Sequence, residues 1–292
     1  EEHRDTNVDC HFLKLVIDET RMYTPRVFRT GSAWRYEGVV HEVPFNRQNP
    51  EAPKVGVPGA FIEHTISDYE RRFSNIWERH IPLLQAQLEE NPKDERALIF
   101  LAQSYETLFP MMEPHERLKY GMEAVSLYMQ RLAIPTGIEV ERNWVRFHLL
   151  DCARMVGLYT EKELLDRALQ LQQDDPQRPE TALLVARASM RVWSMPKIYE
   201  AAARAAQIAE AADQAMDSSA PVSTSCAWQA HHLAAGVARQ LAAKFPDADT
   251  GDGLTWSDRV RQHVARGVAA GGQWELFQRF TEQPKQEAAQ GG

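Results

Sequence analysis

Three prolines recur at nearly constant spacing through the middle of this 292-residue chain. Asn91-Pro92, Ile134-Pro135 and Asp175-Pro176 each precede a helix-like apolar pattern, and the prolines are 43 and 41 residues apart. Proline cannot continue a helix but is tolerated in its first turn, so each proline ends one helical unit and begins the next. A period near forty residues is typical of a stacked array of helix pairs, in which each unit buries its apolar face only against its neighbours.

Apolar residues recur with the period of a helix from about residue 68 nearly to the end of the chain. Four sets of residues each occupy a single helix face. These sets are Leu98, Leu101, Ala102 and Tyr105; Val145, Leu149, Cys152 and Val156; Leu164, Leu165, Ala168 and Leu169; and Leu183, Ala186, Met190 and Trp193. The sequence therefore predicts a mainly α fold, an α-solenoid of antiparallel helix pairs. The array resembles tetratricopeptide repeats, but its longer period predicts long inter-helix loops such as 109–114.

The first 65 or so residues follow the pattern of short strands instead. The residues there are rich in Val, Ile and Phe, or alternate between apolar and polar. Strands are expected at 10–17, 26–29, 34–36, 39–43 and 61–64. Gly31 would supply the turn of a hairpin between the second and third of these strands, because glycine adopts turn conformations readily. Residues 44–59 contain four prolines and two glycines, which predicts a loop.

Charge, hydrophobicity and cysteine content indicate which partners and which cellular compartment fit this chain. The formal net charge is −8 and the pI about 5.7, so a direct electrostatic grip on nucleic acid is not expected. No apolar run is long enough to span a membrane. The three cysteines are widely spaced and form no CxxC pair, which favours reduced thiols in a cytoplasmic protein.

Three segments carry a resemblance to a known family. Pro25-Arg26-Val27-Phe28-Arg29, the segment from Trp34 to Glu42, and Phe61-Ile62-Glu63-His64 resemble the distal catalytic strands of family 2 glycosyltransferases related to lipopolysaccharide-core sugar transferases. Residues 91–105 resemble the helical repeats appended to many bacterial members. The resemblance implies a β-rich remnant of a GT-A α/β domain at 1–66 and tetratricopeptide-like repeats at 67–282. Residues 283–292 are expected to be a disordered tail.

The same resemblance implies a site for inverting sugar transfer from a nucleotide-sugar donor to an acceptor. Such a reaction needs a base for the acceptor hydroxyl and a divalent cation, Mg²⁺ or Mn²⁺, for the leaving diphosphate. Glu42 would be the base, His41 would support it, and His64 would reach the metal. Phosphate and sugar contacts would come from Arg26, Arg29, Trp34 and Tyr36. Without this resemblance, the His41-Glu42 pair fits ordinary surface chemistry and Trp34 and Tyr36 fit core aromatics. Arg26 and Arg29 fit a solvated strand face as well as a phosphate site.

The family's nucleotide-binding half belongs upstream of residue 10. Because the chain begins without methionine and runs almost at once into a strand, we expect a truncated or processed protein. This chain would then be the C-terminal part of a transferase and inactive alone. An acidic motif, Asp247-Ala248-Asp249, and the nearby Asp252 and Asp258 imitate metal-binding patterns but predict a surface turn. His231 and His232 are adjacent in a helix and face different ways, so no metal site is expected there.

Two functions from different classes remain open. One is glycosyl transfer by a longer parent, with this chain supplying the acceptor and metal side of the site. The alternative is a non-catalytic interaction module, in which the helical array binds a segment of a partner protein in its groove and the strands act as a cap.

Overall fold

A computed structural model of the protein describes residues 8–17, 20–40, 42–46, 48–49, 54–64, 74–137, 139–215, 222–223, 225–245 and 248–281. The chain divides into two compact units. Unit 1 is Glu1–Asp175 with Asp217–Val222, and unit 2 is Pro176–Met216 with Ser223–Gly292. The boundaries expected after residues 66 and 282, and the expected tail 283–292, lie outside the described residues. None of the described helices is both long and apolar enough to cross a membrane.

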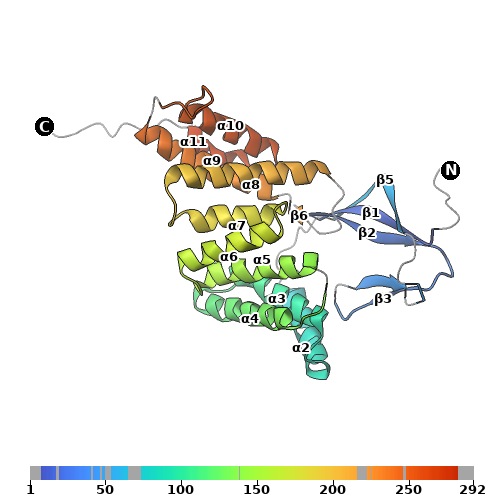
Figure 1. The fold of residues 1–292 in the computed structure, drawn as a ribbon. Coiled ribbons are helices and arrows are strands. Elements are labelled where there is room, and N and C mark those ends of the chain that lie inside the picture. The colour runs from blue at the N-terminus through green and yellow to red at the C-terminus, as the bar shows by residue number, and fades with distance from the viewer. Residues whose placement is uncertain are drawn as a thin grey trace. The chain divides into compact units, whose positions relative to one another are not determined.

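The helices of unit 1 form a row in which each packs on the next along the chain (Figure 1). They are η1 (Ile76–His80), α2 (Ile81–Glu90), α3 (Glu95–Leu108), α4 (Pro114–Ala133), α5 (Glu139–Val156) and α6 (Glu161–Asp174). Pro92 and Pro135 lie in the α2–α3 and α4–α5 loops, where the repeat spacing places them. The expected long loop at 109–114 is short, because Phe109–Met111 forms the 3-10 turn η2 and Pro114 already begins α4.

The predicted helix faces build the core of unit 1. Leu98, Leu101, Ala102 and Tyr105 are all buried in one cluster that also holds residues of α4 and α5, whereas Leu149 and Val156 are only partly buried. Gly121 of α4 has no room for a side chain, since a Cβ there would meet Val156 and Phe109. Helices α4 and α5 therefore approach closely, and burial of apolar area stabilises the row.

Unit 2 is also built of antiparallel helices. They are α7 (Pro179–Ser189), α8 (Met195–Ala215), α9 (Ser225–Lys244), α10 (Trp256–Ala269) and α11 (Trp274–Thr281). Fully buried alanines such as Ala202 and Ala234 let α8 and α9 pack tightly. Met190 was expected on the buried face but is 49% exposed, because α7 ends one residue before it. The predicted mainly α, solenoid-type architecture of helix pairs is confirmed within each unit.

Strands β1 to β5 precede the helices, and the described strands form two sheets. In the first, β1 (Cys10–Ile17) lies between β2 (Thr20–Phe28), which is antiparallel to it, and β5 (Lys54–His64), which is parallel. The strand order is β5-β1-β2-β6, where β6 is Val222–Ser223. The second sheet is a hairpin of β3 (Trp34–Glu37) and β4 (Val43–Asn46).

The strand pairing differs from the sequence prediction in three ways. The expected hairpin of 26–29 with 34–36 is wrong, because β2 pairs with β1 and β3 pairs with β4. Of the strand expected at 39–43, Val39 and Val40 lie in a bend, and β4 begins only at Val43. The expected loop at 44–59 contains Pro44 within β4 and Pro58 within β5; both strands lie at a sheet edge, where a missing backbone N–H is tolerated.

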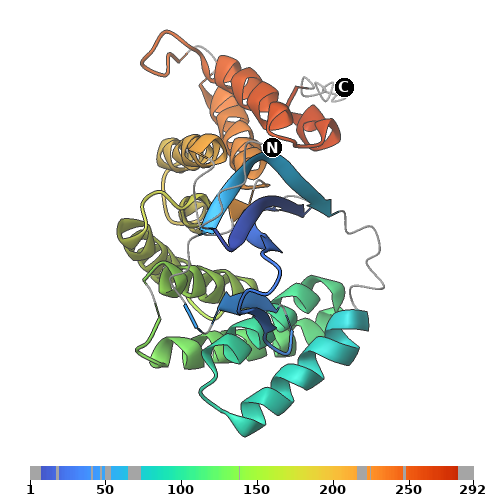
Figure 2. The same ribbon diagram turned by 90° about the vertical axis from the view of Figure 1, so that its right-hand side faces the viewer.

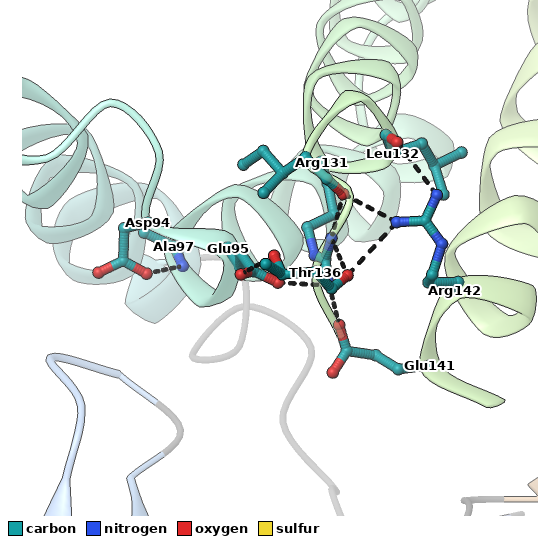
Figure 3. A network of polar contacts seen from close by, with 9 residues as sticks. Asp94, Glu95, Ala97, Arg131, Leu132, Thr136, Glu141 and Arg142 are labelled. Carbon is teal, nitrogen blue, oxygen red and sulfur yellow. Dashed lines mark hydrogen bonds and ion pairs between the residues drawn. The ribbon is translucent and has the colours of Figure 1, made fainter. Parts of the chain in front are cut away.

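A buried arginine joins three helices of unit 1 (Figure 3). The Arg131 side chain is completely buried, and its Nη2 lies 2.6 Å from Glu95 Oε2 at the start of α3 and 2.5 Å from Glu141 Oε1 in α5. Its guanidinium also donates to the carbonyls of Ile134 and Thr136 at 3.3–3.4 Å. The cation thus satisfies carbonyls just beyond α4, where the helix dipole also favours positive charge.

Two neighbours complete this arrangement. Arg142 donates to the carbonyls of Leu132, Ile134 and Thr136, at 2.8 Å for Ile134. Gly137 has φ +93, and a Cβ there would press on Arg131 Nη2 at 2.5 Å. Glycine is therefore required both by the backbone conformation and by the space left beside the guanidinium.

We expect Leu101→Ala to lower the free energy of unfolding by about 2–5 kcal/mol, because the truncation loses buried area and leaves a cavity. Leu118→Ala is the matched control: Leu118 is 58% exposed, so its loss should change stability by no more than about 0.5 kcal/mol. Guanidinium denaturation followed by circular dichroism measures both values. Equal values for the two variants would contradict the assignment of Leu101 to the core.

We expect Arg131→Met to cost about 3 kcal/mol, since it leaves the carboxylates and loop carbonyls without their cation. Arg146→Met provides the comparison, because Arg146 is 35% exposed and pairs with the surface residues Glu139 and Asp174. That change should cost no more than about 1 kcal/mol. Denaturation curves for both variants measure the loss in the free energy of unfolding. A smaller loss for Arg131→Met than for Arg146→Met would contradict the stabilising role of the buried arginine.

Candidate functional site: a cleft between the hairpin and two helices

The hairpin of β3 and β4 lies beside the teal helices of unit 1 (Figure 2), and the connection between its two strands anchors it there. Val40 lies in this connection, is only 6% exposed and belongs to the same core cluster as Leu84 of α2 and Leu98 of α3. Gly38 has φ +117, and a Cβ there would lie 3.2 Å from the Val40 carbonyl oxygen and 3.4 Å from Arg96 Nε. The glycine therefore lets the chain bend and sink Val40 into the helical core.

A cleft of about 680 Å³ lies beside this anchor, between the hairpin and the helices α2 and α3. The hairpin and its connection form one wall, and the other comes from α2 and the start of α3. The lining residues are Glu37, Gly38, Val39, Val40, Phe45, Leu84, Gln87, Asp94, Arg96, Ala97 and Phe100. All of them belong to unit 1. We call this site the hairpin cleft.

The helical wall of the hairpin cleft carries polar side chains that are held in place by hydrogen bonds. Asp94 caps α3, since its Oδ1 accepts the Ala97 N–H at 2.9 Å, and its Oδ2 accepts the Gln87 amide at 3.0 Å. The Arg96 guanidinium lies 4.9 Å from the centre of the Phe100 ring, a cation–π contact. Burial lowers the pKa of Arg96, while the carboxylates of Asp94 and Glu42 oppose this effect. Arginine remains a cation at neutral pH.

The opposite wall presents apolar surface to solvent. Val39 is 42% exposed and Phe45 40% exposed, although both side chains line the hairpin cleft. A concave site with apolar walls and a few fixed polar groups is the usual form of a binding site, and its volume lies within the usual range of about 300–1,000 Å³. The hairpin cleft can therefore hold a ligand that combines apolar and polar groups.

Part of the transferase-like motif lies around this cleft. Glu42, the expected base, is an exposed residue, and it lies near enough to Arg96 for its negative charge to raise the pKa of the guanidinium. Its expected supporter His41 lies outside the described residues. Tyr36 is 53% exposed and makes an edge contact with Phe28 at 6.0 Å. Trp34 is 7% exposed and packs on Phe28 and Cys10, so it is part of the contact between the two sheets.

The other expected site residues lie on the first sheet. Arg26 is exposed on β2, and Arg29 pairs with Asp9 at 3.0 Å. His64 is paired with Ile17, at the end of β1 opposite to Cys10. The hairpin packs at the Cys10 end, and β1 is eight residues long, or about 23 Å. The strands thus carry His64 towards the end of the sheet away from the hairpin.

A carboxylate–histidine pair, of the kind found in many catalytic sites, lies in the helical core. Glu106 accepts from His148 Nδ1 at 2.9 Å and from the Tyr128 hydroxyl at 2.6 Å. Trp144 closes over His148 at 4.3 Å between ring centres. Burial, followed by the charge of Glu106, raises the pKa of the Cys152 thiol far above its ordinary value. A protonated buried thiol is a poor nucleophile, so Cys152 does not supply a thiolate to this cluster.

The acidic turn behaves as the sequence predicts. Asp249 Oδ1 accepts the N–H groups of Gly251 and Gly253 at 2.7 and 2.9 Å, and Asp258 forms a capping box with Thr255 at the start of α10. Asp247 lies outside the described residues. Within the described part of the chain, no three His, Cys, Asp or Glu side chains come together in a way that could hold a metal ion.

Several residues of these sites could not be found from the sequence. Arg96 and Phe100 carry the helical wall of the hairpin cleft, but as i, i+4 neighbours they look like any surface pair. His263 forms a buried chain with His231, although 32 residues separate them. A local helical pattern contains no signal for either arrangement, because both depend on how distant elements pack.

Comparison with known proteins gives likenesses of fold alone. No family model matches the chain, and no curated protein matches it. Among solved structures, MamA shares 10% identity at a TM-score of 0.46, covering 72% of this chain and 96% of its own. BtubC (BKLC) from P. vanneervenii also shares 10% identity, with a TM-score of 0.39, and covers 73% of this chain and 87% of its own. At such TM-scores the likenesses carry no argument about function.

Proposed function

We propose that the protein is a non-catalytic interaction module of helix pairs that binds a short segment of a partner protein in the hairpin cleft. The observation that carries the proposal is the position of Val39 and Phe45, two large apolar side chains left exposed in a concave site. Buried apolar anchors supply most of the binding energy in protein interfaces. An extended peptide could place an apolar side chain between these two residues and the α2–α3 wall.

The polar groups of the hairpin cleft support a peptide as the ligand. The charged side chains of Arg96 and Glu37 line facing walls of the cleft, a donor group on one wall and an acceptor group on the other, and Arg96 is held against Phe100. Donors and acceptors on facing walls suit a peptide backbone, which carries both. The strands then contribute a wall of the binding site, in addition to the capping role expected from the sequence.

A library of random dodecapeptides displayed on phage provides the test. We expect panning on the whole chain to enrich peptides that Phe45→Ala binds at least tenfold more weakly, a loss of about 1.4 kcal/mol. Fluorescence polarisation with synthetic versions of the enriched peptides measures the dissociation constants. Arg96→Gln should weaken binding as well, because it removes the cation from the opposite wall.

Phe245→Ala is the matched control, since Phe245 is also a highly exposed phenylalanine (54%) but lies in unit 2. Its peptide affinities should equal those of the unchanged protein. The proposal would be abandoned if no peptide were enriched, or if the enriched peptides bound Phe45→Ala and Phe245→Ala equally well.

Sugar transfer by a longer parent is a second candidate, and it rests on the strand motifs alone. Against it, Trp34 is buried, Arg29 pairs with Asp9, and His64 lies at the far end of β1 from the hairpin contact. Trp34 and Arg29 thus have partners within the strands and the segment before them, and His64 lies on the first sheet, whereas Glu42 lies in the connection between β3 and β4. The nucleotide-sugar donor, the acceptor and the Mg²⁺ or Mn²⁺ ion belong to this second candidate only.

If the second candidate holds, Glu42→Gln in the parent should abolish turnover, because the amide cannot take up the acceptor proton. Donor affinity, measured by calorimetry with Mn²⁺ and a panel of nucleotide sugars, should stay the same. Glu37→Gln serves as the comparison on the same hairpin and should retain turnover. Full turnover by the Glu42→Gln parent would exclude the assigned base.

A further inference from the structure

A chain of polar side chains crosses the interior of unit 2. The Tyr199 hydroxyl of α8 lies 3.0 Å from His263 Nε2 of α10, and His263 Nδ1 lies 2.9 Å from His231 Nδ1 of α9. His231 Nε2 in turn lies 2.9 Å from Glu210 Oε1 of α8, and Arg266 contacts both oxygens of Glu210. His231 is fully buried and His263 is 6% exposed. We call Tyr199, His263, His231 and Glu210 the histidine latch.

The two imidazoles meet because α9 and α10 approach closely. Gly267 lies one turn after His263, and a Cβ at that position would be only 3.0 Å from the Cβ of His231. Phe277 of α11 is fully buried and packs over the same glycine. The rings are therefore held at a centroid separation of 5.2 Å by packing as well as by their hydrogen bond.

The hydrogen-bond partners determine where the protons of the latch lie. An ionised Glu210 only accepts, so His231 must carry its proton on Nε2 and accept on Nδ1. His263 then donates from Nδ1 and accepts on Nε2, where the Tyr199 hydroxyl donates. With both histidines neutral, every polar atom of the latch has a suitable partner.

The latch can accept one proton but not two. A proton on His231 Nδ1 turns that atom into a donor; His263 can then shift its own proton to Nε2, where the Tyr199 oxygen accepts it. A second proton leaves both Nδ1 atoms as donors, facing each other at 2.9 Å with no acceptor between them. Two buried cations would also repel one another. Double protonation must therefore separate the rings.

We propose that the histidine latch is an acid-sensitive device that holds α8, α9 and α10 together while it carries at most one extra proton and releases them when both histidines are protonated. The three helices supply all of its members, so separating the rings opens contacts between α9 and both of its neighbours. The inference concerns unit 2 and is independent of the function proposed for the hairpin cleft.

The surroundings favour the neutral state of the latch at neutral pH. Burial and the neighbouring charges of His231, Arg266 and Arg259 lower the pKa of His263 to about 3, against the opposing charge of Glu210. Burial also lowers the pKa of His231, although Glu210 opposes this effect. Burial raises the pKa of Tyr199, and Asp252 raises it further against the charge of Arg259. His232, the remaining titratable group on this part of α9, faces Leu276 and Arg279 of α11.

These shifts give the direction of the pH dependence. In an opened or unfolded segment each histidine titrates near its ordinary value of about 6.5. Because both folded pKa values are lower, the latch stabilises unit 2 fully above about pH 6.5 and loses this contribution as the pH falls towards 3. Below pH 6.5, the equilibrium constant for opening should rise by up to about tenfold per pH unit for each histidine.

Hydrogen exchange of the whole chain between pH 7 and pH 5, corrected for intrinsic rates, tests the proposal. We expect the opening constant of α8, α9 and α10 to rise at least tenfold, while α3, α4 and α5 of unit 1 serve as the internal reference. His232→Gln should keep this acid response. The double variant His231→Gln, His263→Gln should lose it, since amides do not titrate.

Nitrogen-15 spectra of the histidine rings in the unmodified protein give a readout that does not depend on any variant folding. At pH 7 we expect two neutral rings of opposite tautomer, with Nε2–H on His231 and Nδ1–H on His263. The proposal is overturned if either ring titrates near 6.5 while α8 to α10 stay closed. It is also overturned if exchange in α8 to α10 rises no more than in α3 to α5.

Discussion

The buried guanidinium of Arg131 is the interaction on which the arrangement of unit 1 depends. It lies where α3 begins, α4 ends and α5 begins, three places at which backbone groups lack partners inside their own helices. Because Glu95 is the first residue of α3, the same contact fixes the start of the helix that carries Arg96 and Phe100. The geometry of the hairpin cleft thus depends on a charge that lies outside it.

The helical part of the fold was largely predictable from the sequence, whereas the strand pairing was not. The stripe from Leu98 to Tyr105 is a local pattern, and every residue in it is buried. Strand partners are chosen by long-range packing instead: β2 pairs with β1 and leaves β3 to β4, and Pro58 enters a strand because β5 lies at an edge. Met190 shows the limit even in helices, since the pattern did not reveal that α7 ends before it.

The hairpin cleft could not be predicted from the sequence, for a similar reason. The motif drew attention to the segment from Trp34 to Glu42, of which Glu37, Gly38, Val39 and Val40 line the cleft, but the site residues named from the motif are not among its lining residues. The other side comes from α2 and α3, and its residues carry no distinctive spacing. Val40 was assigned to a continuous strand, but its burial among helices depends on the backbone conformation at Gly38. A site built from residues that are far apart in the sequence can be recognised only when their packing is known.

The burial of Val40 has a consequence for the order in which the protein folds during synthesis. Leu84 and Leu98, which share its core cluster, lie 44 and 58 residues later in the chain. At roughly 5–20 residues per second, a ribosome releases the hairpin about 3–12 s before Leu98 is available. The strands therefore leave the ribosome first, yet the hairpin can dock only after α3 has emerged. During that interval its apolar side chains are exposed to chaperones and to neighbouring nascent chains.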